Sequence, residues 1–501
     1  MAVDNGTVYL GRSKLYTDYV PDSMADKDNT KIISKETLPT ILQQVWQTHY
    51  RNTNEITYLL NYYKGEQDIL KRKKFVRPDI DNRVVFNHAM AITRDIVGYT
   101  FGKPVCYVQR KDSDKTNVKE LTNLVEAEDK FTSDQELAEY ASICGTAFRG
   151  VFADIHGVED DVPFSIVTLD PRNTFVVYSS QIGNPPVLAC TYYEVEPIGT
   201  NLGEYVYIFY TTDKIYKCKS CGGSLGIITD GSKIEEQDNP MGLIPIVEYR
   251  NNTWGMGDWE MAVNLLNAIN LVGSDCVNDI EGVVNSILVG INLDLSESTQ
   301  EKFKANNIIS FPSMKENPSD LKYIYNQADA TSLENLRSYL LNELSVIVGM
   351  PTANSESYSG GDTGDAVYLR NGYERLEVIA RMKETFFKRS ERNSLRLILK
   401  IMEIKNEPLN LTPKDITIKF SRSMTDNLIS KASALSTLVS TKVLTPEDAL
   451  TLVGLTTEPA EMAKKGKEYW EANTDVTEDK TTETDTKVST KDAKLKQKVD
   501  R

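Results

Sequence analysis

Apolar residues recur every three or four positions along several stretches of this chain, and each such stretch predicts a helix with one buried face. The longest stripe in the N-terminal part spans 36–65 and begins with Leu38, Ile41, Leu42, Val45 and Trp46. Shorter helices are predicted for 86–99 and 133–143, and the second ends at Gly145, because glycine readily adopts the left-handed conformation that closes a helix. The polar residues 1–35 before them are expected to form an extended arm.

Between 146 and 249 the period of the apolar residues changes from about four to two, which predicts strands. The clearest candidates are 164–167, 175–177, 192–195 and 205–210. Turn signals such as Asp170-Pro171 separate them. A mainly β insertion on a helical base predicts an α+β fold.

The stretch 258–289 predicts one long helix with two different sides. Its polar side carries Glu260, Asn264, Asn267, Ser274, Asn278, Glu281 and Asn285, interrupted at Leu271. Its apolar side carries Ala262, Leu265, Ile269, Val272, Cys276, Ile280, Val283 and Ile287. The spacing of about 3.5 residues keeps the polar row on one face. Two interpretations fit: an amphipathic helix with its polar side in solvent, or a helix in a ring of copies whose polar side lines a channel.

A second helix is predicted after a short α/β excursion at 290–328. Thr331 and Glu334 have the spacing of a capping box, in which each side chain bonds a free N–H group of the first turn. Gly349 and Pro351 end this helix. The polar loop that follows has little to bury and is expected to be mobile.

A long helix is then predicted from Asp362 or Thr363 to Ile404. Between Arg370 and Lys400 it holds nine Lys and Arg residues and four Glu residues. Such charge is typical of a solvated face, and a local basic belt that faces acidic neighbours is the alternative.

The C-terminal part is expected to contain a strand at 416–420 and two short helices within 427–453, broken at 443–446. Residues 473–501 hold seven acidic and seven basic residues and no aromatic residue, so they are expected to be disordered.

The composition of the chain is that of an ordinary globular protein with an acidic balance. It has 501 residues, 40% of them hydrophobic, and 57 Lys+Arg against 72 Asp+Glu give a net charge of −15. This balance argues against a protein that grips nucleic acid over a broad basic face, but not against one past which a polyanion slides. No apolar run reaches the length of a membrane span, and the N-terminus lacks a signal-peptide pattern. We expect a soluble protein made in a cytoplasm, with its six cysteines reduced.

Candidate motifs for catalysis or metal binding are weak. Cys218 and Cys221 have the spacing of half a zinc site, but no second cysteine pair or nearby histidine completes it, so a turn in a β-hairpin is the preferred interpretation. Residues 222–226 match the nucleophile-elbow pattern, whose histidine follows the serine. The three histidines, His49, His88 and His156, all precede it.

Two further sequence patterns give no sign of nucleotide or metal binding. There is no phosphate-binding P-loop. An acidic cluster in a strand-linking turn, formed by Asp154, Glu159, Asp160 and Asp161, has the composition of an ordinary turn. We therefore predict no catalytic residue, no metal and no cofactor.

Six short segments, taken in order, resemble the portal proteins of tailed bacteriophages of the siphophage type. They are YYKGEQDIL at 62–70, NRVVFN at 82–87, GYTFGKPV at 98–105, ASICGTA at 141–147, GLIPIVEYRNN at 242–252 and SGGDTGDA at 359–366. Together they cover roughly residues 60 to 400.

The resemblance implies a portal fold in which a wing, a two-helix stem, a clip and a helical crown assemble as a ring. It assigns 1–35 to an N-terminal arm, 36–255 to the wing, 256–290 to the first stem helix, 291–328 to the clip, 329–350 to the second stem helix, 351–363 to the tunnel loop, 364–425 to a long helix and a strand returning to the wing, 426–472 to the crown and 473–501 to a disordered tail.

The implied function is a non-enzymatic channel at one capsid vertex through which double-stranded DNA is packaged and ejected without sequence-specific contacts. The DNA-facing tunnel-loop residues would be Thr352, Asn354, Ser355, Glu356, Ser357 and Tyr358. The channel-lining stem residues would be Glu260, Asn264, Asn267, Ser274, Asn278 and Glu281. An acidic, asparagine-rich wall would repel phosphate and let DNA slide.

The partners implied are a homo-oligomeric ring of 12 subunits, the terminase large subunit, a head-completion or adaptor protein, and the major capsid and scaffolding proteins. The expected location is the portal vertex of the virion, with assembly in the host cytoplasm and no membrane contact. Two alternatives remain open from the sequence: a metal-dependent hydrolase or nuclease built on the acidic turn or on Cys218 and Cys221, and a minor head or adaptor protein outside the channel.

Overall fold

The computed structural model describes residues 11–25, 31–75, 78–110, 115–153, 162–195, 204–221, 234–284, 287–291, 320–324, 330–351, 373–422, 428–440, 445–453 and 462–471. The chain divides into two units. The first comprises Met1–Gly98 and Thr132–Glu407, and the second comprises Tyr99–Phe131 and Pro408–Arg501.

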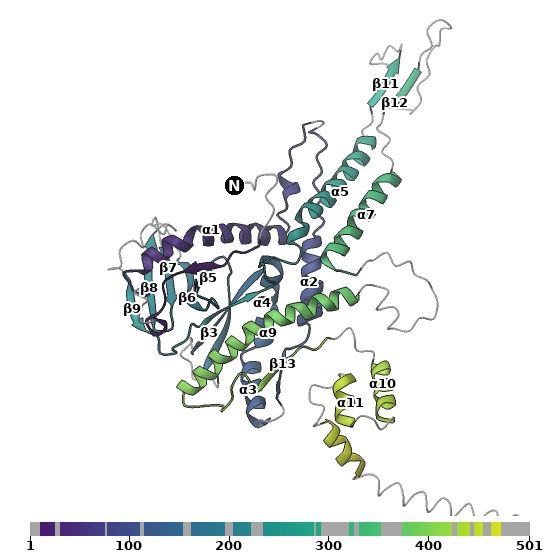
Figure 1. Cartoon of the computed structure of the whole chain (residues 1–501). Coiled ribbons are helices and arrows are strands. Elements are labelled where there is room, and N and C mark those ends of the chain that lie inside the picture. Colours follow the sequence, from purple (N-terminus) through teal and green to yellow (C-terminus); the bar gives the residue numbers. More distant parts are fainter. Residues whose placement is uncertain are drawn as a thin grey trace, which may run out of the picture. The chain divides into compact units, whose positions relative to one another are not determined.

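A six-stranded sheet in the first unit has the order β1-β5-β6-β7-β8-β9 (Figure 1). The strands are β1 (Leu15–Thr17), β5 (Thr174–Ser179), β6 (Pro186–Val195), β7 (Glu204–Tyr210), β8 (Lys214–Cys221) and β9 (Glu235–Asp238). β1 pairs parallel with β5, and each of the other neighbours pairs antiparallel.

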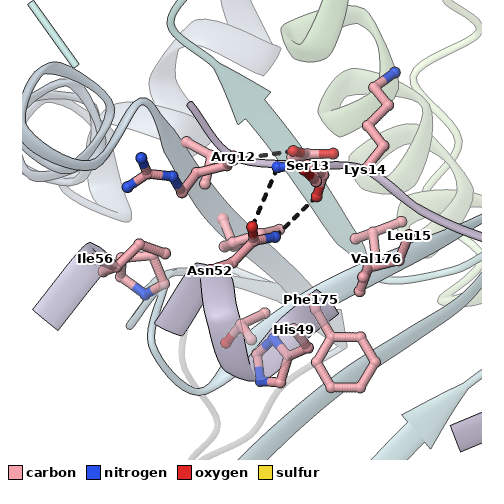
Figure 2. A pocket seen from close by; sticks show the side chains of 14 residues that line it. Arg12, Ser13, Lys14, Leu15, His49, Asn52, Ile56, Phe175 and Val176 are labelled. Atoms are coloured by element: carbon pink, nitrogen blue, oxygen red, sulfur yellow. Dashed lines mark hydrogen bonds between the residues drawn. The ribbon is translucent and has the colours of Figure 1, made fainter. Parts of the chain in front are cut away.

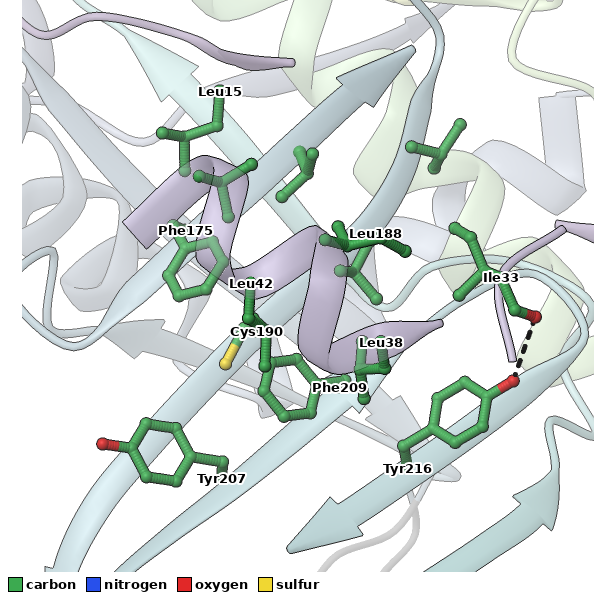
Figure 3. Close-up of a cluster of buried hydrophobic side chains, with 14 of the residues drawn as sticks. Leu15, Ile33, Leu38, Leu42, Phe175, Leu188, Cys190, Tyr207, Phe209 and Tyr216 are labelled. Atoms are coloured by element: carbon green, nitrogen blue, oxygen red, sulfur yellow. Dashed lines mark hydrogen bonds between the residues drawn. The ribbon is translucent and has the colours of Figure 1, made fainter. Parts of the chain in front are cut away.

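Helix α1 (Leu38–Tyr63) packs its predicted apolar stripe on this sheet (Figure 3). Leu38 and Leu42 lie against Phe175, Leu188 and Phe209, all at most 3% exposed. The stripe of α1 and the alternation of the strands are thus the two faces of one core, as their periods predict.

From the region expected to form an N-terminal arm, β1 joins the sheet, and Leu15, Val20 and Ile33 are at most 5% exposed in the same core. One sequence prediction for this unit needs correction. Cys218 lies inside β8 and is 4% exposed, and the strand continues to Cys221, so this pair does not form a turn. The apolar alternation along β8 buries the Cys218 thiol with the core.

A second sheet of three antiparallel strands has the order β10-β3-β4, with β3 (Thr146–Ala153), β4 (Phe164–Leu169) and β10 (Ile246–Arg250). The long helix α9 (Tyr373–Ile404) packs against β10 and β3, and α4 (Lys130–Cys144) leads directly into β3. The predicted change from helix to strands near residue 146 is confirmed.

The first unit also carries two long helices that lie side by side, α5 (Val263–Val284) and α7 (Ala330–Val348) (Figure 1). A short 3-10 turn, η5 (Glu260–Ala262), precedes α5. Strands β11 (Ile287–Ile291) and β12 (Asp320–Ile324) pair antiparallel at the far end of the two helices.

The single helix predicted for 258–289 is therefore shorter than expected. It ends at Val284, and residues 287–291 form β11. The sequence Ile287-Leu-Val-Gly-Ile291 is rich in β-branched residues, which favour strands, and β12 supplies the hydrogen-bonding partner.

In the second unit, β13 (Ile416–Lys419) pairs antiparallel with β2 (Cys106–Gln109), and α3 (Lys115–Ala127) packs on β2. Helices α10 (Leu428–Ser440) and α11 (Pro446–Val453) confirm the two short helices predicted there.

Three further elements lie earlier in the chain. They are α2 (His88–Phe101), η1 (Asp22–Met24) and η2 (Asp68–Lys71). No helix in the described ranges is long and apolar enough to cross a membrane.

Candidate functional site

The polar row of α5 holds an extended segment of the same chain, residues 82–87. The backbone N–H groups of Asn82, Val84 and Phe86 donate to three side chains of the helix. Their acceptors are Asn278 Oδ1 at 2.7 Å, Ser274 Oγ at 2.9 Å and Asn270 Oδ1 at 2.8 Å. We call residues 82–87 the bound segment and this arrangement the amide ladder.

The amide ladder works because two repeats match in length. Alternate residues of an extended chain are about 6.6 Å apart, and residues four apart on a helix are about 6 Å apart. Every second N–H group of the bound segment therefore meets every fourth side chain of α5. An unpaired buried N–H group costs folding free energy. These short polar side chains therefore stabilise the bound segment, whose N–H groups bond to helix side chains instead of to a neighbouring strand.

The row continues beyond the ladder at both ends. Asn267 accepts from the Tyr62 hydroxyl at 2.9 Å and donates to Asp68 at 3.0 Å. Glu281 accepts from the Asn82 side chain at the other end. The chain before residue 82 also contacts α5, because Arg72 forms an ion pair with Asp275 of this helix at 2.7 Å.

A glycine on α5 makes room for the bound segment. A Cβ atom on Gly273 would lie 2.1 Å from Cε2 of Phe86, which is closer than two carbon atoms can approach. On α7, the Arg337 guanidinium lies 5.9 Å from the centroid of the same ring. The Phe86 ring thus contacts both long helices.

The base of α5 carries a buried ion cluster that joins it to the N-terminal arm. Arg12 lies 2.5 Å from Glu260 and 2.9 Å from Glu55, and the side chains of Arg12 and Glu260 are at most 1% exposed. Burial raises the pKa of Glu260, against the opposing effect of Arg12. Removing either partner would leave a buried charge uncompensated, which makes the cluster a structural anchor.

A second polar cluster at the same place joins α5 to α9. Asp258 accepts from Lys383 of α9 at 2.5 Å, from Ser142 at 2.5 Å and from Asn251 at 2.8 Å. Lys383 also donates to the Asn251 side chain at 2.8 Å. The start of α5 is therefore fixed to the end of α4 and to the middle of α9.

A third cluster fixes α9 to the sheet behind it. Arg149 of β3 pairs with Asp134 at 2.5 Å and with Glu391 of α9 at 3.0 Å, and all three side chains are at most 2% exposed. Tyr249 of β10 donates to Glu391 at 2.6 Å and shares a 2.7 Å hydrogen bond with Ser394. With every charge paired, this network joins α4, β3, β10 and α9 into one frame.

The structure changes the assignment of the six stem residues chosen from the sequence. Glu260, Ser274 and Asn278 are at most 3% exposed and are bonded inside their own chain, so the prediction that they face a channel needs correction. Asn267 and Glu281 are half-buried, and Asn264 is exposed. For Asn264 a channel-facing position stays a prediction. The predicted tunnel-loop residues 352–358 lie outside the described residues, as does the acidic turn at 154–161.

Large apolar side chains are exposed along the two long helices. They are Met261, Leu271, Val277 and Ile280, and on α7 Leu336, Tyr339, Val346 and Ile347. They lie on more than one side of the stem, since Leu271 and Ile280 are nine residues, or about two and a half helical turns, apart. Exposed apolar side chains on neighbouring helices are typical of protein-protein contacts. We call these eight residues the apolar stem surface.

The cavity in Figure 2 is a structural site. Its volume is about 20 Å³, which is room for about one water molecule. Asn52 bonds both backbone groups of Ser13 there, at 3.2 and 2.8 Å, and so fixes the N-terminal arm to α1. Burial lowers the pKa of His49 to about 3, so this histidine is neutral at physiological pH. In the described ranges, no group of three or more His, Cys, Asp or Glu residues is placed to hold a metal ion.

The sequence could not reveal the bound segment, but one signal was available. The polar row of α5 is built mainly from asparagine and serine rather than from the Lys and Glu of a solvated helix face. Such side chains are suited to bonding backbone groups, because they are short and offer acceptors and donors together.

These features define a class of protein: a structural subunit with a two-helix stem, fixed at its base by paired charges and exposing apolar side chains along the stem. Residues 42–475 match the family described as "Phage portal protein, SPP1 Gp6-like", so the chain belongs to this portal family. Portal proteins form the channel at one vertex of a phage capsid through which DNA is packaged and ejected, and the family is structural rather than enzymatic.

Comparisons with solved structures and with curated proteins do not extend the family assignment. A matching solved structure is the neck of an empty GTA particle, computed with C6 symmetry. It is 12% identical, with a TM-score of 0.43, and the match covers 73% of this chain and 90% of that chain. No curated protein matches the chain.

Proposed function

We propose that this portal protein assembles as a closed ring, with 12 subunits, in which α5 and α7 form the wall of the DNA channel. The observation that supports this proposal is the apolar stem surface, which has no cover within the described part of the chain. A ring brings identical copies side by side, so each copy covers the exposed apolar residues of the next.

Within this ring we assign different tasks to the two kinds of polar residue on α5. The buried ones hold the bound segment and keep the helix rigid, and the exposed Asn264 faces the channel. The tunnel-loop residues 352–358 contact the DNA, which slides because the net charge of −15 on each subunit disfavours sticky phosphate contacts.

The remaining parts are assigned to partners. Residues 291–328 dock the terminase large subunit during packaging and a head-completion protein afterwards. The major capsid and scaffolding proteins contact the body that carries the stem. Assembly takes place in the host cytoplasm, and the mature protein occupies the portal vertex of the virion.

The ring is tested by placing charge on the apolar stem surface. Ile280 is 68% exposed and Tyr339 is 61% exposed, so the double variant Ile280→Asp, Tyr339→Asp should fold as a monomer but form no rings. Mass photometry gives the assembly state, and circular dichroism checks the fold. Tyr50→Asp is the matched control, because Tyr50 is 59% exposed on α1, away from the stem surface. Rings that persist in the double variant would contradict the proposal.

A further inference from the structure

A cleft of about 560 Å³ lies between helix α9 and strands β5, β6 and β10. Four of the side chains that line it are basic: Lys14, Arg250, Arg389 and Arg396. Among the described residues that line it, Glu248 is the single acidic one. A positive cleft stands out on a chain whose net charge is −15.

The one carboxylate in the cleft is already occupied. Glu248 accepts hydrogen bonds from Tyr178 at 2.5 Å and from Thr146 at 3.0 Å, and it pairs with Arg250 at 3.3 Å. Lys14 lies 4.6 Å from the centroid of the Tyr178 ring. Burial lowers the pKa of Lys14, and the charges of Arg250 and Arg389 add to this against Glu248. The surplus of positive charge comes from the count of side chains, since Glu248 is paired with Arg250 while Lys14, Arg389 and Arg396 add to the same lining.

Two of the arginines form a wall on α9. Arg389 and Arg396 are seven residues apart, so they lie on one side of the helix, two turns or about 10 Å apart. Both are exposed. Arg396 donates to Asn393 at 2.5 Å, while no hydrogen bond or ion pair holds Arg389 within the described part of the chain.

Much of the remaining lining is apolar. It includes the aliphatic Val176, Pro185, Pro186, Ile244 and Ile246 and the aromatic Tyr178 and Phe386. A ligand that fits this lining combines anionic groups with apolar groups.

We propose that this cleft binds an extended acidic peptide segment of a partner protein. Side chains of an extended peptide point alternately to opposite sides, so carboxylates can face Arg389 and Arg396 while aliphatic side chains face Pro185 and Pro186. A single nucleic-acid strand fits less well, because such strands bind by stacking successive bases on aromatic faces, and of the two aromatic side chains here Tyr178 already has Lys14 over its ring. The site gives the basic face of α9 a function separate from the DNA channel.

A labelled peptide tests the site on the full-length protein. The probe is a fluorescein-labelled peptide of six residues with alternating Glu and Leu, and the readout is fluorescence anisotropy. The double variant Arg389→Ala, Arg396→Ala should weaken binding about tenfold, because two partly exposed charge contacts are lost. Arg375→Ala is the control: Arg375 is exposed on the same helix but about 21 Å along it from Arg389, so affinity should change less than about twofold.

Three results would overturn the proposal. They are no detectable binding of the peptide, equal affinity in the wild type and the double variant, and equal affinity for a peptide of alternating Glu and Ser. Tighter binding of a labelled oligothymidine that depends on the same two arginines would assign the cleft to nucleic acid instead. Mass photometry of each sample separates these outcomes from a failure of ring formation, because peptide binding requires only the folded subunit.

Discussion

Asn278 illustrates how one amide side chain can hold a neighbouring stretch of backbone. It is 3% exposed, and its Oδ1 atom accepts the N–H group of Asn82 at 2.7 Å. Asn264, on the same helix, is exposed. The two asparagines look equivalent in the sequence, and burial alone separates the structural one from the candidate channel residue.

The pair gives a direct test of this difference. Asn278→Leu leaves the Asn82 N–H group buried without an acceptor and should lower the free energy of unfolding by about 1–3 kcal/mol. Asn264→Leu should change it by less than about 0.5 kcal/mol, because that side chain is in solvent. Urea unfolding of both variants measures the difference, and equal losses would argue against the amide ladder.

His49 makes the body of the protein sensitive to acid. Its ring lies 4.4 Å from the Phe175 ring between centroids, and its Nε2 atom lies 3.1 Å from the Tyr192 hydroxyl. Burial lowers its pKa from 6.5 to about 3. The unfolded chain therefore binds a proton below pH 6.5 that the folded chain does not, so stability is full above pH 6.5 and is lost as the pH falls toward 3.

Replacing His49 should remove this contribution. Between pH 7.5 and 5.5, wild-type protein should lose about 1.4 kcal/mol more of its unfolding free energy than His49→Phe. Chemical denaturation at the two pH values measures this loss. Identical pH dependence in the two proteins would mean that the histidine is hydrated in the folded state.

At the scale of elements, α5 and the bound segment behave as one unit. The Phe86 ring occupies the space that a side chain on Gly273 would fill, and it reaches Arg337 of α7. The contact fixes the bound segment to both stem helices, so changes in the bound segment should affect the stem.

A double-mutant cycle tests this packing. Gly273→Ala should destabilise the protein by about 1–3 kcal/mol, because the new Cβ atom displaces the Phe86 ring. In a Phe86→Ala background the same change should be neutral or stabilising by up to about 1 kcal/mol, since alanine is the better helix former. Thermal or urea unfolding of the four proteins gives the coupling, and additive effects would show that the ring and the glycine do not interact.

The helices could be predicted from the spacing of their apolar residues, but the segments that pack against them could not. The stripe of α1, a helix ending near Gly349 and the two short helices after 427 are confirmed, because each depends on local spacing. The predicted capping box is not confirmed, because α7 begins at Ala330 and Thr331 lies inside the helix. The end of α5 was wrong because a distant partner, β12, draws residues 287–291 into a strand. A helical period shows which residues share a face, but not what covers that face.

The same holds for the polar row of α5 and for the buried ion cluster at its base: a pattern within one element could be predicted, but contacts between distant segments could not. Most of the polar row of α5 was found from the sequence, but Asn270, which accepts from Phe86, was missed. The partner segment lies about 190 residues earlier in the chain, and no local signal joins the two. Arg12 was missed altogether, because a single arginine in a polar arm carries no pattern until the fold buries it beside Glu260.

At the scale of the whole molecule, the family assignment and the apolar stem surface point to the same assembly. Membership in the portal family implies an oligomeric ring in a capsid. Within the first unit, the clusters around Arg149 and Asp258 connect α9 and the three-stranded sheet to the base of the stem through paired charges. In the ring proposed above, the contact between subunits depends on residues that the isolated subunit leaves exposed.

A reconstruction of the purified full-length protein by electron cryomicroscopy tests this central claim most directly. It should show a closed ring in which Ile280 and Tyr339 are buried between adjacent copies and Asn264 faces the central opening. Monomers at every concentration, or a ring whose subunits leave Ile280 and Tyr339 in solvent, would contradict it.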